Sequence, residues 1–168
     1  MTNVLRQSSR KDVQAMHNVR LSVHENQLIS TSICESDYWR ETEINGRGWV
    51  IESDGEIVAF AIGNASTGNV WALFVRPECE GEGHGRRLLT TVSEWLWTQG
   101  REILWLATRP NTRAAAFYTR AGWSQRGYFA SGELRFELRR KSKPQGPAAP
   151  SEADSTNAEP DAPTGANA

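Results

Sequence analysis

Residues 70–100 constrain the fold of this chain most strongly. The run 70–75 is apolar, rich in branched and aromatic side chains and too short for a helix, and Pro77 closes it. Such a run predicts a buried strand. Apolar residues at helical spacing follow and stop at Gly100, which predicts a helix with one buried face. The residues of this face are Leu88, Leu89, Val92, Trp95 and Leu96.

Three glycines, Gly81, Gly83 and Gly85, lie between the predicted strand and helix. Without Cβ atoms, the backbone N–H groups of this loop can approach a ligand closely, where the unpaired donors of the helix start point outward. These donors and the helix dipole together favour an anion, above all a phosphate. The segment therefore predicts an anion site.

Arg86 and Arg87 follow in the first helical turn. The helix dipole disfavours a cation there by roughly 0.3–1 kcal/mol, and a bound phosphate would reverse that effect. The alternative is that the loop acids Glu78, Glu80 and Glu82 simply pair with these two arginines. The acids leave the loop with a formal negative charge, which is unfavourable for an anion site.

Two common phosphate-binding patterns are excluded. Residues 83–88 lack the last glycine of the dinucleotide pattern, and no acid follows about 20 residues later. A Walker loop requires Gly-Lys-Ser/Thr, which is missing here.

The rest of the chain predicts a mixed α/β (α+β) fold with the order β-α-α-β-β-β-α-β-α-β-β. Besides 70–75, strands are expected at residues 4–6, 48–52, 57–62, 103–107, 123–126 and 134–138. Besides the helix that ends at Gly100, we expect one capped by Ser9 and running to residue 23, a short one from Ser36 or Asp37, and one capped by Asn111 that covers 114–121 before Gly122.

Length and composition indicate one folded domain at 1–140 and a tail at 141–168. The tail holds most of the prolines and no aromatic residue, Val, Ile, Leu or Met, so we expect it to be disordered. A net charge of −1 gives no reason to expect nucleic acid or an anionic membrane as a partner. No apolar run is long enough to span a bilayer, and the N-terminus lacks a signal pattern, so a cytoplasmic protein is expected. The two cysteines and three histidines lack metal-ligand spacing, so no metal is expected.

The glycine loop resembles the acyl-CoA loop of the GNAT superfamily of N-acetyltransferases, which reads Gln/Arg-x-x-Gly-x-Gly/Ala after a strand. Glu80, Gly83 and Gly85 occupy these positions, with Glu80 departing from the usual Gln or Arg. The segment from Asn111 through Tyr118 to Trp123 is similar to a second GNAT motif, Asn…Ala-x-x-Phe-Tyr-x-x-x-Gly-Phe. The predicted order of elements is the GNAT order as well.

The resemblance implies an acetyl-CoA-dependent N-acetyltransferase, in which a primary amine of a small molecule or peptide attacks the thioester directly. Cofactor contacts are then expected from Leu73, Phe74, Val75, Gly81, Glu82, Gly83, His84, Gly85, Arg86, Asn111 and Tyr118. The alternative is a non-catalytic acyl-CoA-binding sensor or interaction module. A homodimer is also compatible with the resemblance.

Within this resemblance Tyr118 is the candidate general acid, because a phenol remains protonated at neutral pH and can donate to a departing thiolate. The alternative is an aromatic ring that only packs α-helix against sheet. Asn111 is either a helix cap alone or a cap that also touches the CoA arm. A backbone N–H near Val75 is expected to face the developing oxyanion. His84 is expected at the loop surface.

The general base and the acceptor pocket stay open at this point. Glu25, His24 or a chain of water molecules could take the proton from the amine. Trp39, Trp49 and Trp71 either line the acceptor pocket or belong to the core.

Overall fold

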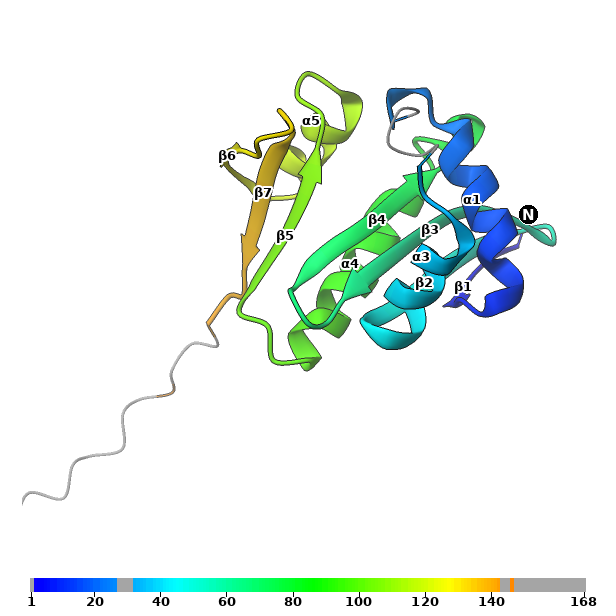
Figure 1. Cartoon of the computed structure of the whole chain (residues 1–168), viewed down its shortest axis with the longest axis horizontal. Helices are drawn as coiled ribbons and strands as arrows, with labels where there is room; N and C mark the ends of the chain where they lie inside the picture. The colour runs from blue at the N-terminus through cyan, green and yellow to red at the C-terminus, as the bar shows by residue number, and fades with distance from the viewer. Residues whose placement is uncertain (1, 27–31, 143–145, 147–168) are drawn as a thin grey trace, which may run out of the picture.

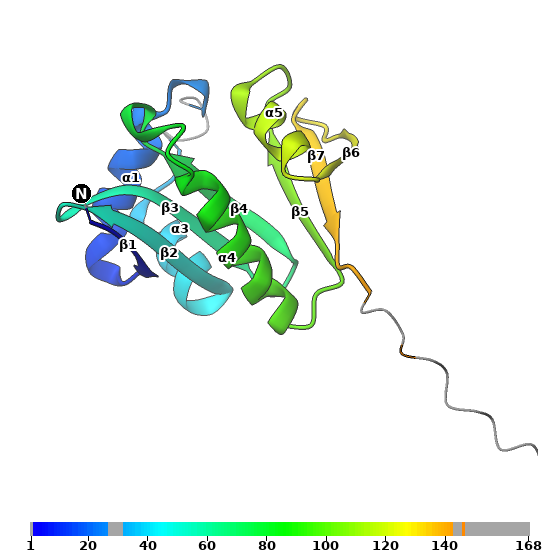
Figure 2. The same ribbon diagram turned by 180° about the vertical axis from the view of Figure 1, so that it is seen from behind.

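The computed structural model describes residues 2–26, 32–142 and 146, and it contains a seven-stranded sheet with helices on both faces (Figure 1). The strand order across the sheet is β1-β2-β3-β4-β5-β7-β6. Helices α1 and α3 cover one face, and α4 and α5 cover the other, as the view from behind shows (Figure 2).

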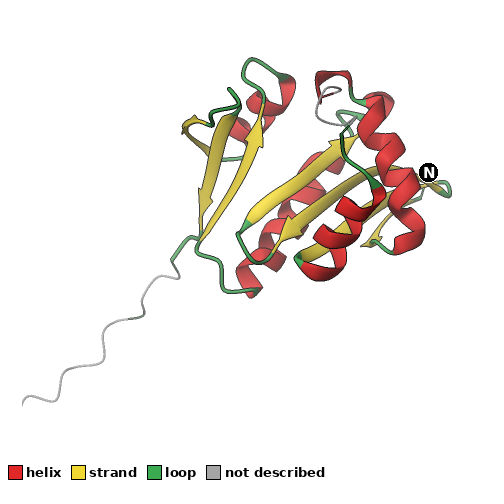
Figure 3. Ribbon diagram, viewed as in Figure 1, coloured by secondary structure: helices red, strands yellow, loops and turns green. Residues whose placement is uncertain are grey.

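The order of elements along the chain confirms the predicted one, and Figure 3 shows how strands and helices alternate. The strands are β1 (Asn3–Gln7), β2 (Gly46–Ser53), β3 (Glu56–Asn64), β4 (Asn69–Val75), β5 (Ile103–Thr108), β6 (Ser124–Tyr128) and β7 (Leu134–Arg139). The α-helices are α1 (Val13–Ser22), α3 (Glu35–Trp39), α4 (His84–Thr98) and α5 (Arg113–Arg120).

Two apolar clusters, one on each face, hold the layers together. The predicted face of α4 packs on β2, β3 and β4, and its residues Leu88, Val92 and Leu96 are fully buried. On the opposite face, Met16 and Val19 of α1 pack against β3 and β4. Because β3 contributes to both clusters and is buried on both sides, it is the centre of the domain.

β4 and β5 are parallel neighbours that separate along their length. Their only paired residues are Asn69 and Trp105, at the start of β4, and beyond that point the two strands diverge (Figures 1 and 2). The divided sheet thus consists of β1–β4 on one side and β5, β7 and β6 on the other.

A β-bulge lies in β4 just after this pairing ends. Ala72 is in register with Ile62 of β3, but Val70 is in register with Gly63, so Trp71 is the extra residue. A bulge bends the bulged strand and increases its twist. This bend contributes to the divergence of β4 from β5.

The cap of α5 differs from the prediction. The N-cap is Thr112, whose Oγ1 accepts a hydrogen bond from the Ala115 N–H at 3.2 Å. Asn111 precedes it with a left-handed backbone, at φ 60°. Asn and Thr are both good N-caps, and Asn also tolerates the left-handed region better than Thr. The turn therefore places Asn111 one residue before the cap.

The predicted disordered tail, 141–168, lies almost entirely outside the described residues and stays a prediction. No helix within the described part of the chain is long and apolar enough to cross a membrane.

A charged cluster joins the N-terminus to the sheet. Arg6 on β1 donates to both carboxylate oxygens of Asp12, at 2.8 and 2.9 Å, and to Oε2 of Glu52 on β2 at 3.1 Å. The backbone N–H of Ser9 also donates to Asp12, at 2.7 Å. The hydrogen bonds from Arg6 contribute most, and together with those from Ser9 they lower the pKa of the Asp12 carboxyl to about 2.

Asp12→Asn should reduce the free energy of unfolding by about 1–2 kcal/mol at neutral pH, because the amide keeps the shape but loses the charge. Folding lowers the pKa of Asp12. The ionised carboxylate therefore contributes fully to the free energy of unfolding above its unfolded pKa near 4, and this contribution is lost as the pH falls towards 2. Denaturant unfolding of both proteins at pH 7 and pH 3 measures this. The difference should shrink at the lower pH.

Glu43→Gln is the matched control, because it removes a carboxylate from an exposed pair with Arg10. It should change the stability little at either pH. Equal effects of the two substitutions would contradict a special role for Asp12.

Candidate functional site

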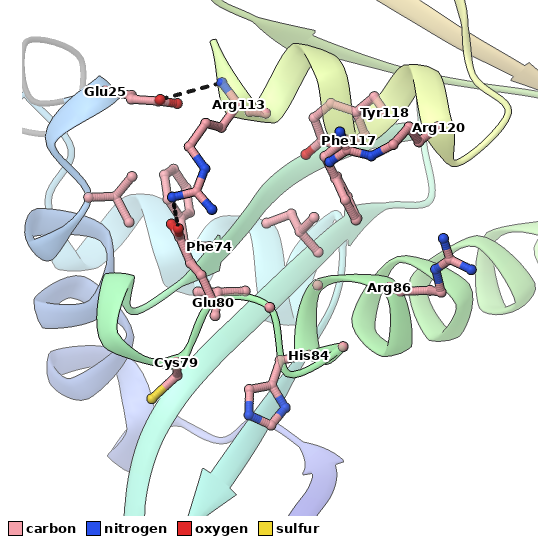
Figure 4. A pocket seen from close by; sticks show the side chains of 17 residues that line it. Glu25, Phe74, Cys79, Glu80, His84, Arg86, Arg113, Phe117, Tyr118 and Arg120 are labelled. Atoms are coloured by element: carbon pink, nitrogen blue, oxygen red, sulfur yellow. Dashed lines mark hydrogen bonds and ion pairs between the residues drawn. The ribbon is translucent and has the colours of Figure 1, made fainter.

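A cavity of about 380 Å³ lies between the second half of β4, the glycine loop and α5 (Figure 4). Nine of the residues predicted from the sequence line it, namely Leu73, Phe74, Val75, Gly81, Gly83, His84, Gly85, Arg86 and Tyr118. The cavity therefore brings together the β4 strand, the glycine loop and the tyrosine of α5.

The edge of β4 that faces the cavity carries unpaired backbone groups. Arg76 donates its N–H to Val58 on β3 at 2.8 Å. Because successive residues of a strand direct their amides to opposite edges, those of Leu73 and Val75 point away from β3, towards the cavity. β5 does not pair with them. An extended ligand could therefore bind to this edge as an added strand would.

The start of α4 opens onto the cavity through two glycines. Its N-cap, Gly83, has φ 85°, and Gly81 has φ 82°, a conformation that favours glycine. A Cβ added at either position would have no other atom within 4 Å, so these backbones face open space. The helix therefore presents its unpaired N–H groups and positive dipole end to the cavity.

The three acids of the glycine loop do not pair with the arginines in the first turn of α4. Among the described residues, Glu78 approaches Arg76, Glu80 pairs with Arg113, and Glu82 approaches His84. None of the three pairs with Arg86 or Arg87 in the first turn of α4. Arg86 lines the cavity, so its charge remains available to an anion there.

His84 is buried, contrary to the prediction that it lies at the loop surface. It is 4% exposed, and its Nε2 lies 3.0 Å from Oε2 of Glu82. His84 is the first residue of α4, and the helix start turns its ring inward. The contact with Glu82 joins the loop to the first turn of α4.

An ion pair links the two halves of the divided sheet at the cavity. The guanidinium of Arg113, on α5, pairs with the carboxylate of Glu80, in the loop after β4. The backbone N–H of Arg113 also donates to Oε1 of Glu25 at 3.4 Å. Figure 4 shows both contacts. All three residues line the cavity, so the first half of the chain meets α5 there.

Tyr118 packs in the core and also lines the cavity. Its ring packs against Phe117, Trp123 and Phe136 at centroid distances of 5.2, 6.0 and 5.8 Å. Its hydroxyl end faces the cavity (Figure 4) and makes no hydrogen bond with another described residue. The residue is 6% exposed, and burial raises the pKa of the Tyr118 phenol above its usual value. The phenol is therefore protonated, and it has no hydrogen-bond partner within the described residues.

Cys79 also lines the cavity but is not an activated thiol. Burial raises the pKa of Cys79, with a further contribution from the negative charges of Glu82 and Glu78. A thiol with a raised pKa carries little thiolate at neutral pH. It contributes shape and not reactivity.

Several predicted residues lie elsewhere. Glu82 and Asn111 do not line the cavity, and neither do the three tryptophans considered for an acceptor pocket. Trp49 belongs to the core beside Trp95, and Trp39 and Trp71 pack against the cluster under α1. Of the two named candidate bases, Glu25 lines the cavity and His24 does not.

Five further residues line the cavity and were not predicted as site residues, namely Val23, Arg113, Ala114, Phe117 and Arg120. Four of these belong to α5, in which a site role was predicted for Tyr118 alone. The spacing of Arg113, Phe117 and Arg120, three and four residues apart, places them on one face of the helix with Tyr118 near its edge. This spacing could have indicated the cavity face of α5.

Three solved structures illustrate the fold. The yncA protein from Salmonella typhimurium, solved with its cofactor acetyl-CoA, aligns with a TM-score of 0.69 at 14% identity over 89% of this chain and 100% of its own. The ribosomal-protein-S18-alanine N-acetyltransferase from Escherichia coli has a TM-score of 0.67 and 19% identity, over 86% of this chain and 97% of its own.

The paia N-acetyltransferase from Thermoplasma acidophilum, solved in complex with coenzyme A, has a TM-score of 0.67 and 13% identity, over 83% of this chain and 100% of its own. No curated protein is similar enough in sequence to count as a match. These structures share the fold of this chain.

The sequence itself matches the family described as the acetyltransferase (GNAT) family, over residues 14–123. This match includes the glycine loop and the segment from Asn111 to Trp123, which are the two motifs that surround the cavity. The chain therefore belongs to the GNAT acetyltransferase family.

Proposed function

We propose that this chain is an N-acetyltransferase that moves the acetyl group of acetyl-CoA to a primary amine of a small molecule or peptide. The observation that carries the proposal is that three features meet in one cavity: the unpaired edge of β4, the N-terminus of α4, and the hydroxyl of Tyr118, which no other described residue engages. Acetyl-CoA, when bound, supplies an acetyl group activated as a thioester.

The residues present fit this co-substrate. The edge at Leu73 and Val75 offers N–H and C=O groups to an amide-bearing arm, and the start of α4 with Arg86 offers donors and positive charge to a pyrophosphate. Arg86 and Arg120 also line an adjoining hollow of about 360 Å³ between α4 and the second half of the sheet. This hollow gives room for the rest of a long ligand.

Tyr118 and Glu25 are the residues to which we assign the proton transfers. The Tyr118 phenol donates its proton to the departing thiolate, since its raised pKa keeps it protonated. The Glu25 carboxylate takes the proton from the acceptor amine, because it is the one named candidate base that lines the cavity. Its hydrogen bond from the Arg113 N–H fixes its position.

The proposal is tested by measuring acetyl-CoA binding by calorimetry and thiol release with a panel of primary amines. Gly83→Glu should abolish binding, because it adds a side chain and a negative charge where backbone donors meet phosphate. Gly100→Glu, at the far end of α4, is the matched control, since Gly100 also has a positive φ and open space around it. It should bind normally.

The outcome also separates the enzyme from the acyl-CoA sensor. Binding without turnover, with every amine of the panel, would favour the sensor. Normal binding by a folded Gly83→Glu variant would place the anion elsewhere.

Glu80→Gln should tighten acetyl-CoA binding about fivefold, on the order of 1 kcal/mol, because it removes a negative charge from the cavity and releases Arg113. Arg113→Gln should weaken binding to a similar degree. The double variant restores the charge balance and should bind much as the wild type does. Titrations at low and high salt measure these differences, which should shrink with salt.

Glu78→Gln removes the same charge from the same loop but outside the cavity, and its partner is Arg76. Its effect on affinity should be smaller than that of Glu80→Gln. If Glu80→Gln weakened binding instead, the carboxylate of Glu80 would be accepting a hydrogen bond from the ligand.

Tyr118→Phe should lower kcat by about 10²–10⁴-fold, the usual scale for a general acid, while leaving acetyl-CoA affinity nearly unchanged. The ring contacts with Phe117, Trp123 and Phe136 survive the change, so the fold should persist. Tyr128→Phe removes the same hydroxyl from a residue that is 70% exposed and outside the cavity, and it should have no effect. Steady-state kinetics under saturating substrates decide, and full kcat in Tyr118→Phe would remove the phenol from the mechanism.

A further inference from the structure

Arg20 is a cation buried under the first helix. It lies in the last turn of α1 and is 2% exposed. Its guanidinium is surrounded by aromatic rings of α3, β3 and β4. The distances from its Cζ to the ring centroids are 4.6 Å for Trp71, 4.9 Å for Phe74, 5.3 Å for Tyr38 and 6.0 Å for Phe60.

No anion accompanies this charge within the described residues. Nε and Nη1 of Arg20 are buried without a hydrogen-bond partner. Asp37 of α3 exerts an attraction on Arg20, but its carboxylate is bonded to the Cys34 N–H at 2.9 Å and to Arg40 at 3.3 Å. The Tyr38 hydroxyl is engaged with Nδ1 of His17 at 3.1 Å.

Stability alone does not explain an arginine here. Burial lowers the pKa of Arg20, but a guanidinium remains charged in proteins. The rings return part of the desolvation cost through cation–π attraction, while two N–H-bearing nitrogens stay unpaired. An apolar side chain of similar length would fill the space without that cost. The missing partner of Arg20 is therefore an anion that the described part of the chain does not supply.

The position of Arg20 indicates which ligand brings the anion. Phe74, whose ring lies against the guanidinium, lines the cavity, and so does Val23, the residue that ends α1. Arg20 thus lies directly behind the cavity wall, on the face of the sheet covered by α1. The glycine loop leads into α4 on the opposite face (Figures 1 and 2).

Two anion-binding features on opposite faces fit two different substrates. The donors of the loop and Arg86 would hold the phosphates of the acyl donor, so these phosphates have no need of Arg20. The acceptor amine has to approach the cavity from another side, and Glu25, the proposed base, comes from the same end of α1 as Arg20. The second anion therefore belongs to the acceptor.

We infer that Arg20 is the receptor for a carboxylate of the acceptor, so that the acceptor is an amino acid or a short peptide whose carboxylate lies near its amine. The inference rests on the proposed function. A guanidinium presents parallel N–H groups that match a carboxylate, and its flat faces can remain stacked on aromatic rings. The inference requires the ring of Phe74, which contacts the guanidinium and lines the cavity, to move when the carboxylate binds.

The test compares acetylation of each carboxylic acid with acetylation of its uncharged carboxamide. Amino acids with α- and ω-amines and dipeptides are offered with acetyl-CoA, each beside its carboxamide, which keeps the amine and loses the charge. In the wild type, kcat/KM for the preferred acid should exceed that for its carboxamide by at least about 100-fold. In Arg20→Met the ratio should fall to near one, and Arg20→Lys should retain part of it because it keeps the charge but loses the fork.

Readouts other than acceptor choice separate this role from a structural one. Arg20→Met should bind acetyl-CoA normally and should melt no lower than the wild type, because it removes an unpaired buried charge. A lower melting temperature with an unchanged acid-to-carboxamide ratio would overturn the inference. If Arg20→Met does not fold, the ratio in the wild type and in Arg20→Lys decides alone.

Calorimetry of the same acids and carboxamides without acetyl-CoA makes the two proposals distinguishable. If the wild type binds an acid and Arg20→Met does not, the carboxylate site is supported. If, in addition, no amine is acetylated, the transferase proposal alone fails. Turnover with equal preference for acids and carboxamides leaves the transferase standing and overturns the carboxylate site. Tight binding of inorganic phosphate in place of the acids would overturn it as well.

Discussion

The end of pairing between β4 and β5 is the constraint on which the rest of the site depends. Parallel strands in one sheet normally hydrogen-bond along their length, yet these two pair only at Asn69 and Trp105. The bulge at Trp71 bends β4 just beyond that point. A continuous sheet would satisfy the backbone groups of Leu73 and Val75 internally and would close the cavity. The divergence leaves a polar edge in the middle of the sheet, with which a ligand can pair.

The divided sheet explains why charged contacts gather at the cavity. β1–β4 with α1 form one half, and β5–β7 with α5 form the other, and near the cavity the halves are joined by Arg113 with Glu80 and Glu25. Such exposed pairs are individually weak. A ligand lying between the halves can therefore exchange its own charges for these without a large loss in stability. The contacts that bridge the cavity are those that a binding event can rearrange.

Much of the fold and half of the site follow from local sequence patterns. The run at 70–75, the glycines and the apolar face of α4 predicted a strand, a loop and a helix in their correct order, because each depends on neighbouring residues alone. Contacts between distant segments were not predictable in this way. The residues around Glu80 do not indicate that Arg113 is its partner. Because His84 is polar and lies in a glycine-rich loop, the sequence predicts an exposed side chain, whereas the helix start buries it. The cap of α5 was misassigned by one residue because Asn111 and Thr112 both suit a cap.

Arg20 shows a signal that the sequence does carry. It lies seven residues after Val13 and four after Met16, so helical spacing places it on the buried face of α1. A charged residue at such a position conflicts with the apolar pattern around it, and such conflicts concentrate at functional sites. The structure resolves the conflict into a cation among four rings behind the cavity wall. In the reaction we propose, Arg20 and the glycine loop bind different anions on the two faces of one sheet, so the two substrates can meet without exchanging sites.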